Sequence, residues 1–216
     1  MKVSCNELDA AVRKAFRGVG YAWGEAEEAG KAAVWLARRS LPFGRAVIDL
    51  LEAASDDVGA LRPVTGLGTW TSKSGEICPV LSGIALADDP SQLEASETIR
   101  IEGLRSAVLF LPFMAQAASA GMRDLTLLTR ALEARFCCAG IHVSLSPVEA
   151  NRPAAAALSA HAGAKTAASP LRVHRHAADI PAEEWEALLR FAARTYVPAS
   201  QRSRVAGAGA GLVDND

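Results

Sequence analysis

The sequence lacks several features that identify common classes of protein. It has no uninterrupted run of about 18 apolar residues, so it predicts no membrane-spanning helix. Its 23 lysines and arginines are balanced by 24 aspartates and glutamates, whereas nucleic-acid binders usually carry a clear basic surplus. Residues 1–11 carry charges where an export signal needs an apolar region. We therefore expect a cytoplasmic protein with neither a membrane nor a nucleic acid as its partner.

Cysteine and histidine are scarce, and their spacing is not that of a metal site. The four cysteines form no C-x-x-C pair, and buried thiols in a reducing cytoplasm account for them: Cys5, Cys78, Cys137 and Cys138. His174 and His176 would share one face of a strand, but no third ligand has suitable spacing. We predict no metal and no other cofactor.

Motifs for nucleophilic catalysis are also missing. Ser82 precedes Gly83 but lacks the G-x-S-x-G context that exposes a nucleophile. Cys137 and Cys138 are near His142 in sequence, which counts for little because catalytic pairs are assembled by the fold. The sequence identifies no catalytic residue and leaves open whether the protein is an enzyme.

The N-terminal part of the chain predicts helices. Ser4 and Glu7 have the spacing of a capping box, and Val3 and Leu8 that of a hydrophobic staple. Gly18 and Gly20 would end this first helix. A second helix, Trp23–Arg39, has small residues on its inner face, which predicts close antiparallel packing against the first, and a third helix covers Arg45–Ala54.

Strands are predicted after residue 56. Thr69–Thr71 and Ile77–Leu86 are interpreted as a hairpin with its turn near Ser74 and Gly75. Further short strands are expected at Thr98–Glu102, Leu125–Leu128, Arg135–Cys138, Ile141–Leu145 and Leu171–His176.

Two segments allow alternatives. Residues 107–120 fit one helix kinked at Pro112, which we favour, or a strand followed by a helix with Pro112 at its first position. The alanine-rich residues 154–168 fit a loose helix or an exposed linker.

A final helix begins at Pro181 and ends before Pro198, with Trp185, Leu188, Leu189 and Ala192 on its buried face. Helices at both ends and short antiparallel strands between them predict an α+β fold. We expect one domain over 1–198, with a helical part (1–55) and a mixed part (56–198), followed by an extended Gly/Ala tail (199–216).

Two long stretches carry a resemblance to a known family. VSCNELDAAVRKAFRGVGYAWGEAEEAGKAAVWLARR (3–39) and TYVPASQRSRVAGAGAGLVDND (195–216) resemble an uncharacterised bacterial domain-of-unknown-function family. The resemblance implies a self-contained intracellular bacterial protein, and it implies no reaction, cofactor or catalytic residue.

The first fifty residues are also similar to the N-terminal helical segment of the malate/sulfolactate type of NAD(P)-dependent dehydrogenase. In that family the helix leads into a Ser-His-Gly sequence with the catalytic histidine. The matching place here is Ser40-Leu41-Pro42-Phe43-Gly44, which contains no histidine. The resemblance therefore implies that this chemistry is missing from the chain.

Candidate ligand-binding residues occur in two places. The turn at residues 69–76 combines an aromatic ring, a cation and a carboxylate in Trp70, Lys73 and Glu76, which suit a small polar ligand or simply a structural hairpin. Arg190 and Arg194 share a helix face and suit an anionic small molecule or an acidic partner, or a solvated surface.

The tail GAGAGLVDND does not fit a phosphate-binding loop or a calcium loop, because neither the following helix nor the distal glutamate is present. It is either a terminal segment without fixed structure or a docking tail that inserts into a groove on this or a partner subunit. The docking interpretation involves Gly207, Gly209, Gly211, Asp214 and Asp216.

Two functions follow from these observations. The first is a non-catalytic accessory or small-ligand-binding protein of a metabolic pathway, which acts with a protein partner or as a homo-oligomer. The second is an enzyme that acts on a small polar metabolite with acid–base residues near the Trp70 hairpin. A deep pocket lined by Glu76 or His142 would favour the enzyme.

Overall fold

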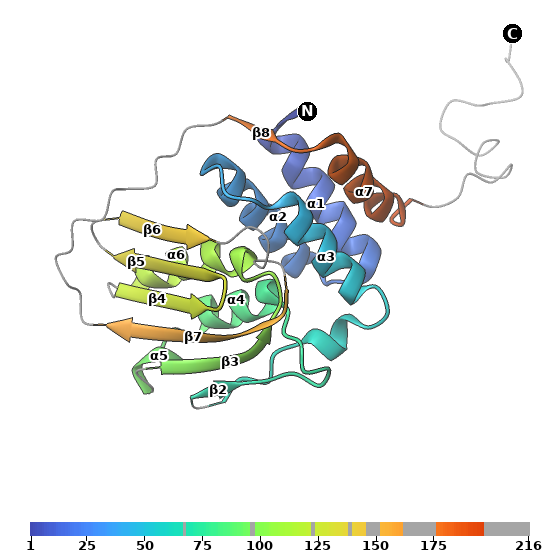
Figure 1. Ribbon diagram of the computed structural model, residues 1–216. Helices are drawn as coiled ribbons and strands as arrows, with labels where there is room; N and C mark the ends of the chain where they lie inside the picture. The colour runs from blue at the N-terminus through green and yellow to red at the C-terminus, as the bar shows by residue number, and fades with distance from the viewer. Residues whose placement is uncertain are drawn as a thin grey trace, which may run out of the picture.

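A six-stranded sheet and a cluster of helices make up the structure (Figure 1). The computed structural model describes residues 1–66, 68–95, 98–121, 124–137, 140–145, 152–161 and 176–196. Helices α1, α2, α3 and α7 lie together beside the sheet, while α4 and α6 cover one of its faces. The fold is α+β, as predicted, with the helices of the N-terminal part in one cluster.

Helix α1 (Cys5–Val19) begins and ends as its sequence predicts. Ser4 Oγ accepts from the Glu7 amide at 3.1 Å, and the Glu7 carboxylate accepts from the Ser4 amide at 2.8 Å, so the capping box is confirmed. Gly20 ends the helix in a left-handed conformation, with φ 111°. Val3 and Leu8, the two staple residues, are both buried.

Helix α2 (Trp23–Arg38) packs against α1 through its small residues, as predicted. A Cβ added at Gly30 would overlap the side chains of Asp9 and Arg13, so the two backbones approach closely there. The short turn at Gly20–Ala22 makes this pairing antiparallel, because residues equally far from the turn meet. Helix α3 (Gly44–Ala54) follows, one residue longer than expected, and a 3₁₀ turn, η1 (Val58–Leu61), comes after it.

The chain returns to this helical cluster near its other end. Strand β8 (Ala177–Asp179) pairs antiparallel with β1 (Lys2–Ser4), and it leads into α7 (Ala182–Ala193), which packs on α1 and α3. Leu188 and Ala192 are buried on α7, as predicted. Leu189 is exposed, so its prediction was wrong, and Phe191 takes its place against α1.

The six-stranded sheet has the order β2-β3-β7-β4-β5-β6. Only the β2–β3 pair is parallel among these described strands. Their bounds are β2 Thr69–Trp70, β3 Thr98–Leu104, β4 Asp124–Thr129, β5 Leu132–Cys137, β6 Gly140–Leu145 and β7 Ala154–His161. The predictions of β3, β4, β5 and β6 are therefore confirmed, and Ile99 and Ile101 point inward from β3.

Two predictions for this region were wrong. Residues 154–161 form the interior strand β7 rather than a helix or linker, because hydrogen-bonded neighbours on both sides override the helical preference of alanine. Residues 79–88 form helix α4 (Pro79–Asp88) rather than the second strand of a hairpin. Pro79 lies at the start of α4, where its missing N–H costs nothing, and β2 pairs with β3 instead.

Residues 107–121 are helical, so the strand alternative is wrong. A 3₁₀ turn, η2 (Ala107–Phe110), leads into α6 (Leu111–Gly121), and Pro112 lies in the first turn of α6. A one-turn helix, α5 (Gln92–Ala95), precedes β3. Among the described residues, no helix has both the length and the apolar character needed to cross a bilayer. Of the strand predicted at Leu171–His176, only His176 is among the described residues, and the tail at 199–216 lies outside them.

The contact between α4 and α6 gives a test of this packing. A Cβ at Gly83 in α4 would overlap the Phe113 ring, so we expect Gly83→Ala to lower the free energy of unfolding by about 1–3 kcal/mol. Gly24 in α2 has no atom within 4 Å of an added Cβ. As the control, Gly24→Ala should raise that free energy by up to about 1 kcal/mol through helix propensity. Urea denaturation measures both, and equal effects of the two substitutions would contradict the packing described.

Candidate functional site

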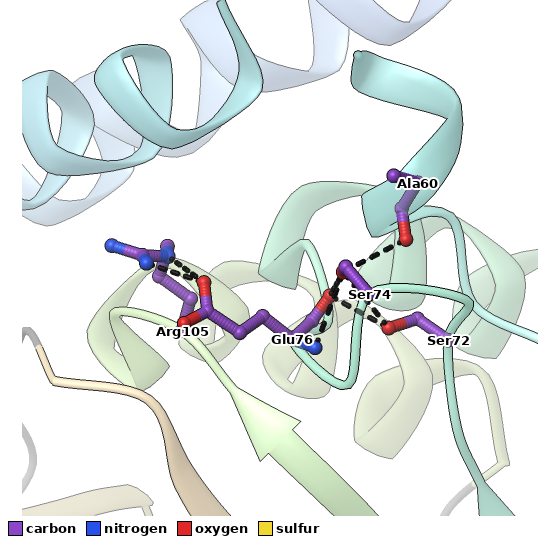
Figure 2. A network of polar contacts seen from close by, with 5 residues as sticks. All are labelled: Ala60, Ser72, Ser74, Glu76 and Arg105. Atoms are coloured by element: carbon purple, nitrogen blue, oxygen red, sulfur yellow. Dashed lines mark hydrogen bonds and ion pairs between the residues drawn. The ribbon is translucent and has the colours of Figure 1, made fainter. Parts of the chain in front are cut away.

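The turn at residues 69–76 is held by hydrogen bonds to its own backbone and to η1 (Figure 2). Ser72 Oγ donates to the Glu76 carbonyl at 2.8 Å. Ser74 Oγ lies 2.9 Å from the Ala60 carbonyl and 3.0 Å from that of Glu76. The Ser72 and Ser74 hydroxyls of this turn are thus engaged by backbone carbonyls.

The predicted ligand-binding residues of this turn do not converge. Glu76 forms a two-point ion pair with Arg105, in which Arg105 Nε lies 2.9 Å from Glu76 Oε2 (Figure 2). Trp70 is fully buried, so its ring offers no platform to a ligand, and its Nε1 has no hydrogen-bond partner among the described residues. Lys73 is exposed. This geometry favours the structural interpretation of the turn over the enzyme hypothesis built on it.

Arg190 and Arg194 lie on α7 and at its C-terminal end, away from the turn. Arg190 is exposed. The Arg194 guanidinium stacks 4.6 Å from the centre of the Phe191 ring and donates to Ser55 Oγ at 3.3 Å. Their role in anion binding stays a prediction.

A different part of the molecule contains a cleft of about 480 Å³ between α2, α3, β6 and α7. We call it the Ser40 cleft. It combines an apolar wall with a hydroxyl, two carboxylates and a guanidinium. Its lining residues are Ala37, Ser40, Leu41, Pro42, Phe43, Gly44, Arg45, Leu145, Asp179, Pro181 and Glu184.

Ser40 reaches the cleft through an unusual backbone conformation. It follows the last turn of α2 with φ 56°, a left-handed position that glycine normally fills at a helix end. The Leu41 amide then donates to the Leu36 carbonyl at 3.1 Å, which closes the helix. A non-glycine residue in this region costs roughly 1 kcal/mol or more, and such strain is concentrated at functional sites.

Glu184 carries the most distinctive chemistry of the cleft. Its carboxylate reaches from α7 to the N-terminus of α3, beside Gly44 and the Arg45 backbone amide. Gly44 permits this approach, because a Cβ at that position would overlap Glu184 Oε2. Burial raises the pKa of Glu184 above its ordinary value, and the Arg45 charge and the backbone amide of Arg45 oppose the rise only in part.

The one arginine of the lining is already engaged by carboxylates outside the cleft. Arg45 forms an ion pair with Asp49 one turn further along α3, and its Nη2 lies 3.4 Å from Glu52 Oε2. These contacts raise the pKa of Arg45, chiefly through the hydrogen bond to Asp49. Glu184 and Asp179 bring two carboxylates to the same lining.

The candidates from the sequence included only part of this cleft. Residues 40–44 were singled out as the place where a dehydrogenase family that the first fifty residues resemble has a histidine. Glu184 was not identified, because its contact with Gly44 spans 140 positions and no local motif marks it. The fold of α7 over α3 creates the site.

Comparison with known proteins finds a family match over the N-terminal part of the chain and no activity. Residues 3–79 match the family described as "Protein of unknown function (DUF3726)", in agreement with the resemblance to an uncharacterised family. Among curated proteins, none matches the sequence.

Two solved structures are similar in shape. Malate dehydrogenase from Pyrococcus horikoshii OT3 aligns at 11% identity and a TM-score of 0.46, over 67% of this chain and 49% of that one. Malate dehydrogenase from Entamoeba histolytica aligns at 11% identity and a TM-score of 0.44, over 79% and 50%. The chain thus spans about half the length of these proteins, and neither activity nor substrate transfers to it at this similarity.

A substitution of Glu76 tests the structural role of the turn. Glu76→Gln removes the charge that pairs with the half-buried Arg105, so we expect the free energy of unfolding to fall by about 0.5–1.5 kcal/mol. Lys73→Gln, at the exposed tip of the same turn, should leave it unchanged within about 0.5 kcal/mol. Thermal unfolding measures both variants, and a neutral Glu76→Gln would contradict the role.

Glu184 should contribute a pH dependence to stability. Because its folded-state pKa is raised above its ordinary value of 4.5, the folded protein holds this proton more tightly than the unfolded chain. The resulting stability is fully present below pH 4.5 and is lost as the pH rises through the folded-state pKa. Urea denaturation at a series of pH values, from below 4.5 to above the folded-state pKa, should show that Glu184→Gln lacks this loss of stability. Glu186→Gln, at an exposed position of α7, is the control and should show the same dependence of stability on pH as the wild type. If Glu184→Gln also shows the wild-type dependence, Glu184 is not the group responsible.

Proposed function

We propose that this protein binds a small molecule with an apolar body and a protonated amine, and that the Ser40 cleft is its binding site. This makes it a ligand-binding or accessory protein, and no reaction is assigned to the cleft. The observation that carries the proposal is the Glu184 carboxylate, held at the α3 N-terminus beside an apolar wall.

The size and lining of the cleft suit such a ligand. About 480 Å³ is within the range of sites for small molecules, which are mostly apolar with a few polar groups that fix orientation. Leu41, Phe43 and Leu145 would cover the body of the ligand. The Ser40 hydroxyl is a further polar group in the same lining.

The charge of the ligand is inferred from the group that already fills the anion-binding position at the N-terminus of α3. The N-terminus of a helix attracts anions, and at α3 the Glu184 carboxylate fills that place. Arg45 is engaged by Asp49 and Glu52, so it offers little to a second anion. An ammonium group instead gains a hydrogen bond to a charged partner, worth about 1.5–3 kcal/mol.

Hexylamine, hexanol and hexanoate form a matched set of probes that differ only in the head group. We expect hexylamine to bind best by calorimetry, with NMR shifts centred on Leu41, Phe43 and Glu184, because only its ammonium complements the carboxylates. Glu184→Gln should weaken that binding roughly tenfold, which corresponds to about 1.4 kcal/mol. Lowering the pH through the pKa of Glu184 should weaken it as well, since protonation removes the charge.

Glu186→Gln is the matched control, because Glu186 lies on α7 outside the cleft lining and should leave amine binding unchanged. If hexanoate binds as well as hexylamine, the cleft is an anion site and the proposal is wrong. Shifts confined to another surface would contradict it equally.

A further inference from the structure

One face of the six-stranded sheet is open at its centre. Helices α4 and α6 cover the other face, where Ile99, Leu127 and Leu158 are buried (Figure 1). Side chains alternate along a strand, so the positions between these residues point to the opposite side. On that side Leu128 is 53% exposed, although it lies on the interior strand β4. The middle of the sheet therefore presents an unpartnered surface.

A single row of side chains crosses this open face from one edge of the sheet to the other. Each member is paired with the next in the ladder, strand by strand from β2 to β6. All but the alanine are exposed, and the alanine is half-buried. We call these residues the central row: Thr69, Arg100, Ala157, Leu128, Glu133 and Ser144.

The central row is complementary to itself. Its midpoint lies between β7 and β4, where the small Ala157 is next to the large Leu128. One strand further out on either side are the cation of Arg100 and the carboxylate of Glu133, and both ends of the row carry a hydroxyl. A two-fold axis along the strands through this midpoint would place small against large and cation against carboxylate, as an isologous interface requires.

Arg100 and Glu133 do not meet within one copy. Two strands lie between them, which at the usual strand spacing separates their backbones by about 14 Å. Within the described ranges neither of them forms an ion pair. Unpaired surface charges are common on this chain, and what distinguishes these two is that one symmetry operation pairs both of them in both copies.

The dimensions of the face suit two packed sheets. Such sheets lie about 10 Å apart, a gap that a long arginine and a glutamate span from opposite sides. The six strands cover about 24 Å, and a strand of six residues is about 20 Å long, so two copies bury roughly 1,000 Å² in all. This area is at the lower limit of specific interfaces, and it predicts a weak, reversible dimer.

We infer that two copies of this chain associate face to face through the central row, about a two-fold axis that runs along the strands between β7 and β4. Leu128 of each copy lies over the partner's Ala157, and Arg100 pairs with the partner's Glu133. Aligned sheets are rotated by about 30°, and the length of these two side chains accommodates the resulting offset. The inference is independent of the Ser40 cleft, because the central row shares no residue with its lining.

Charge reversal tests this pairing by sedimentation velocity, over concentrations from micromolar to millimolar. Arg100→Glu and Glu133→Arg each place like charges opposite each other twice in a dimer. Each should raise the dissociation constant of the dimer roughly tenfold or more. The double variant Arg100→Glu/Glu133→Arg restores opposite charges at both places, so its dissociation constant should return to within about threefold of the wild type.

Arg190→Glu is the matched control, because it changes the net charge as Arg100→Glu does at an exposed position of α7. It should leave association unchanged, and circular dichroism should show that every variant is folded, since all substituted positions are exposed. A wild-type chain that stays monomeric at millimolar concentration overturns the inference. So does a dimer that neither single substitution weakens, or a double variant that associates as poorly as the single ones.

Discussion

The contact between the Glu184 carboxylate and the N-terminus of α3 is the constraint on which the account of this protein depends. It requires Gly44, because any side chain there would displace the carboxylate. It joins α7 to α3, and both of these elements contribute residues to the cleft. Partial burial of the same carboxylate raises its pKa, and the charge of Arg45 opposes that rise. A single interaction thus organises both the packing and the electrostatics of the site.

The remainder of the fold acts as a rigid support for that contact. The β1–β8 pair joins the start of the chain to the segment that precedes α7, with the Met1 amino group 2.6 Å from the Ile180 carbonyl. Helices α4 and α6 cover the sheet, and β6 ends at Leu145 in the cleft wall. The polar turn around Glu76, which has the composition of a binding loop, instead fastens η1 and the end of β3 to each other. The residue types of this turn suited a ligand site, and the contacts observed for them are internal to the fold.

Local signals predicted much of the fold, and long-range contacts explain what they missed. The capping box at Ser4, the glycine at position 20 and the alternation in β3 each act within a few residues, and all three predictions are confirmed. Strand β7 was missed because alanine favours helices in isolation, and only its pairing with β3 and β4 makes it a strand. Helix α4 was missed because Ile77–Leu86 was interpreted as the second strand of a hairpin, whereas Pro79 begins a helix. The cleft was beyond such reasoning, since Gly44 and Glu184 meet only in the folded chain.

The central claim is that the Ser40 cleft is a binding site whose polar anchor is the Glu184 carboxylate. A crystal structure of the protein with hexylamine measures this most directly. The account predicts that the amine nitrogen lies within hydrogen-bond distance of Glu184 or Asp179, with its alkyl chain along Leu41 and Phe43. A cleft filled with the amine directed away from both carboxylates, or an amine bound elsewhere while the cleft stays unoccupied, would contradict it.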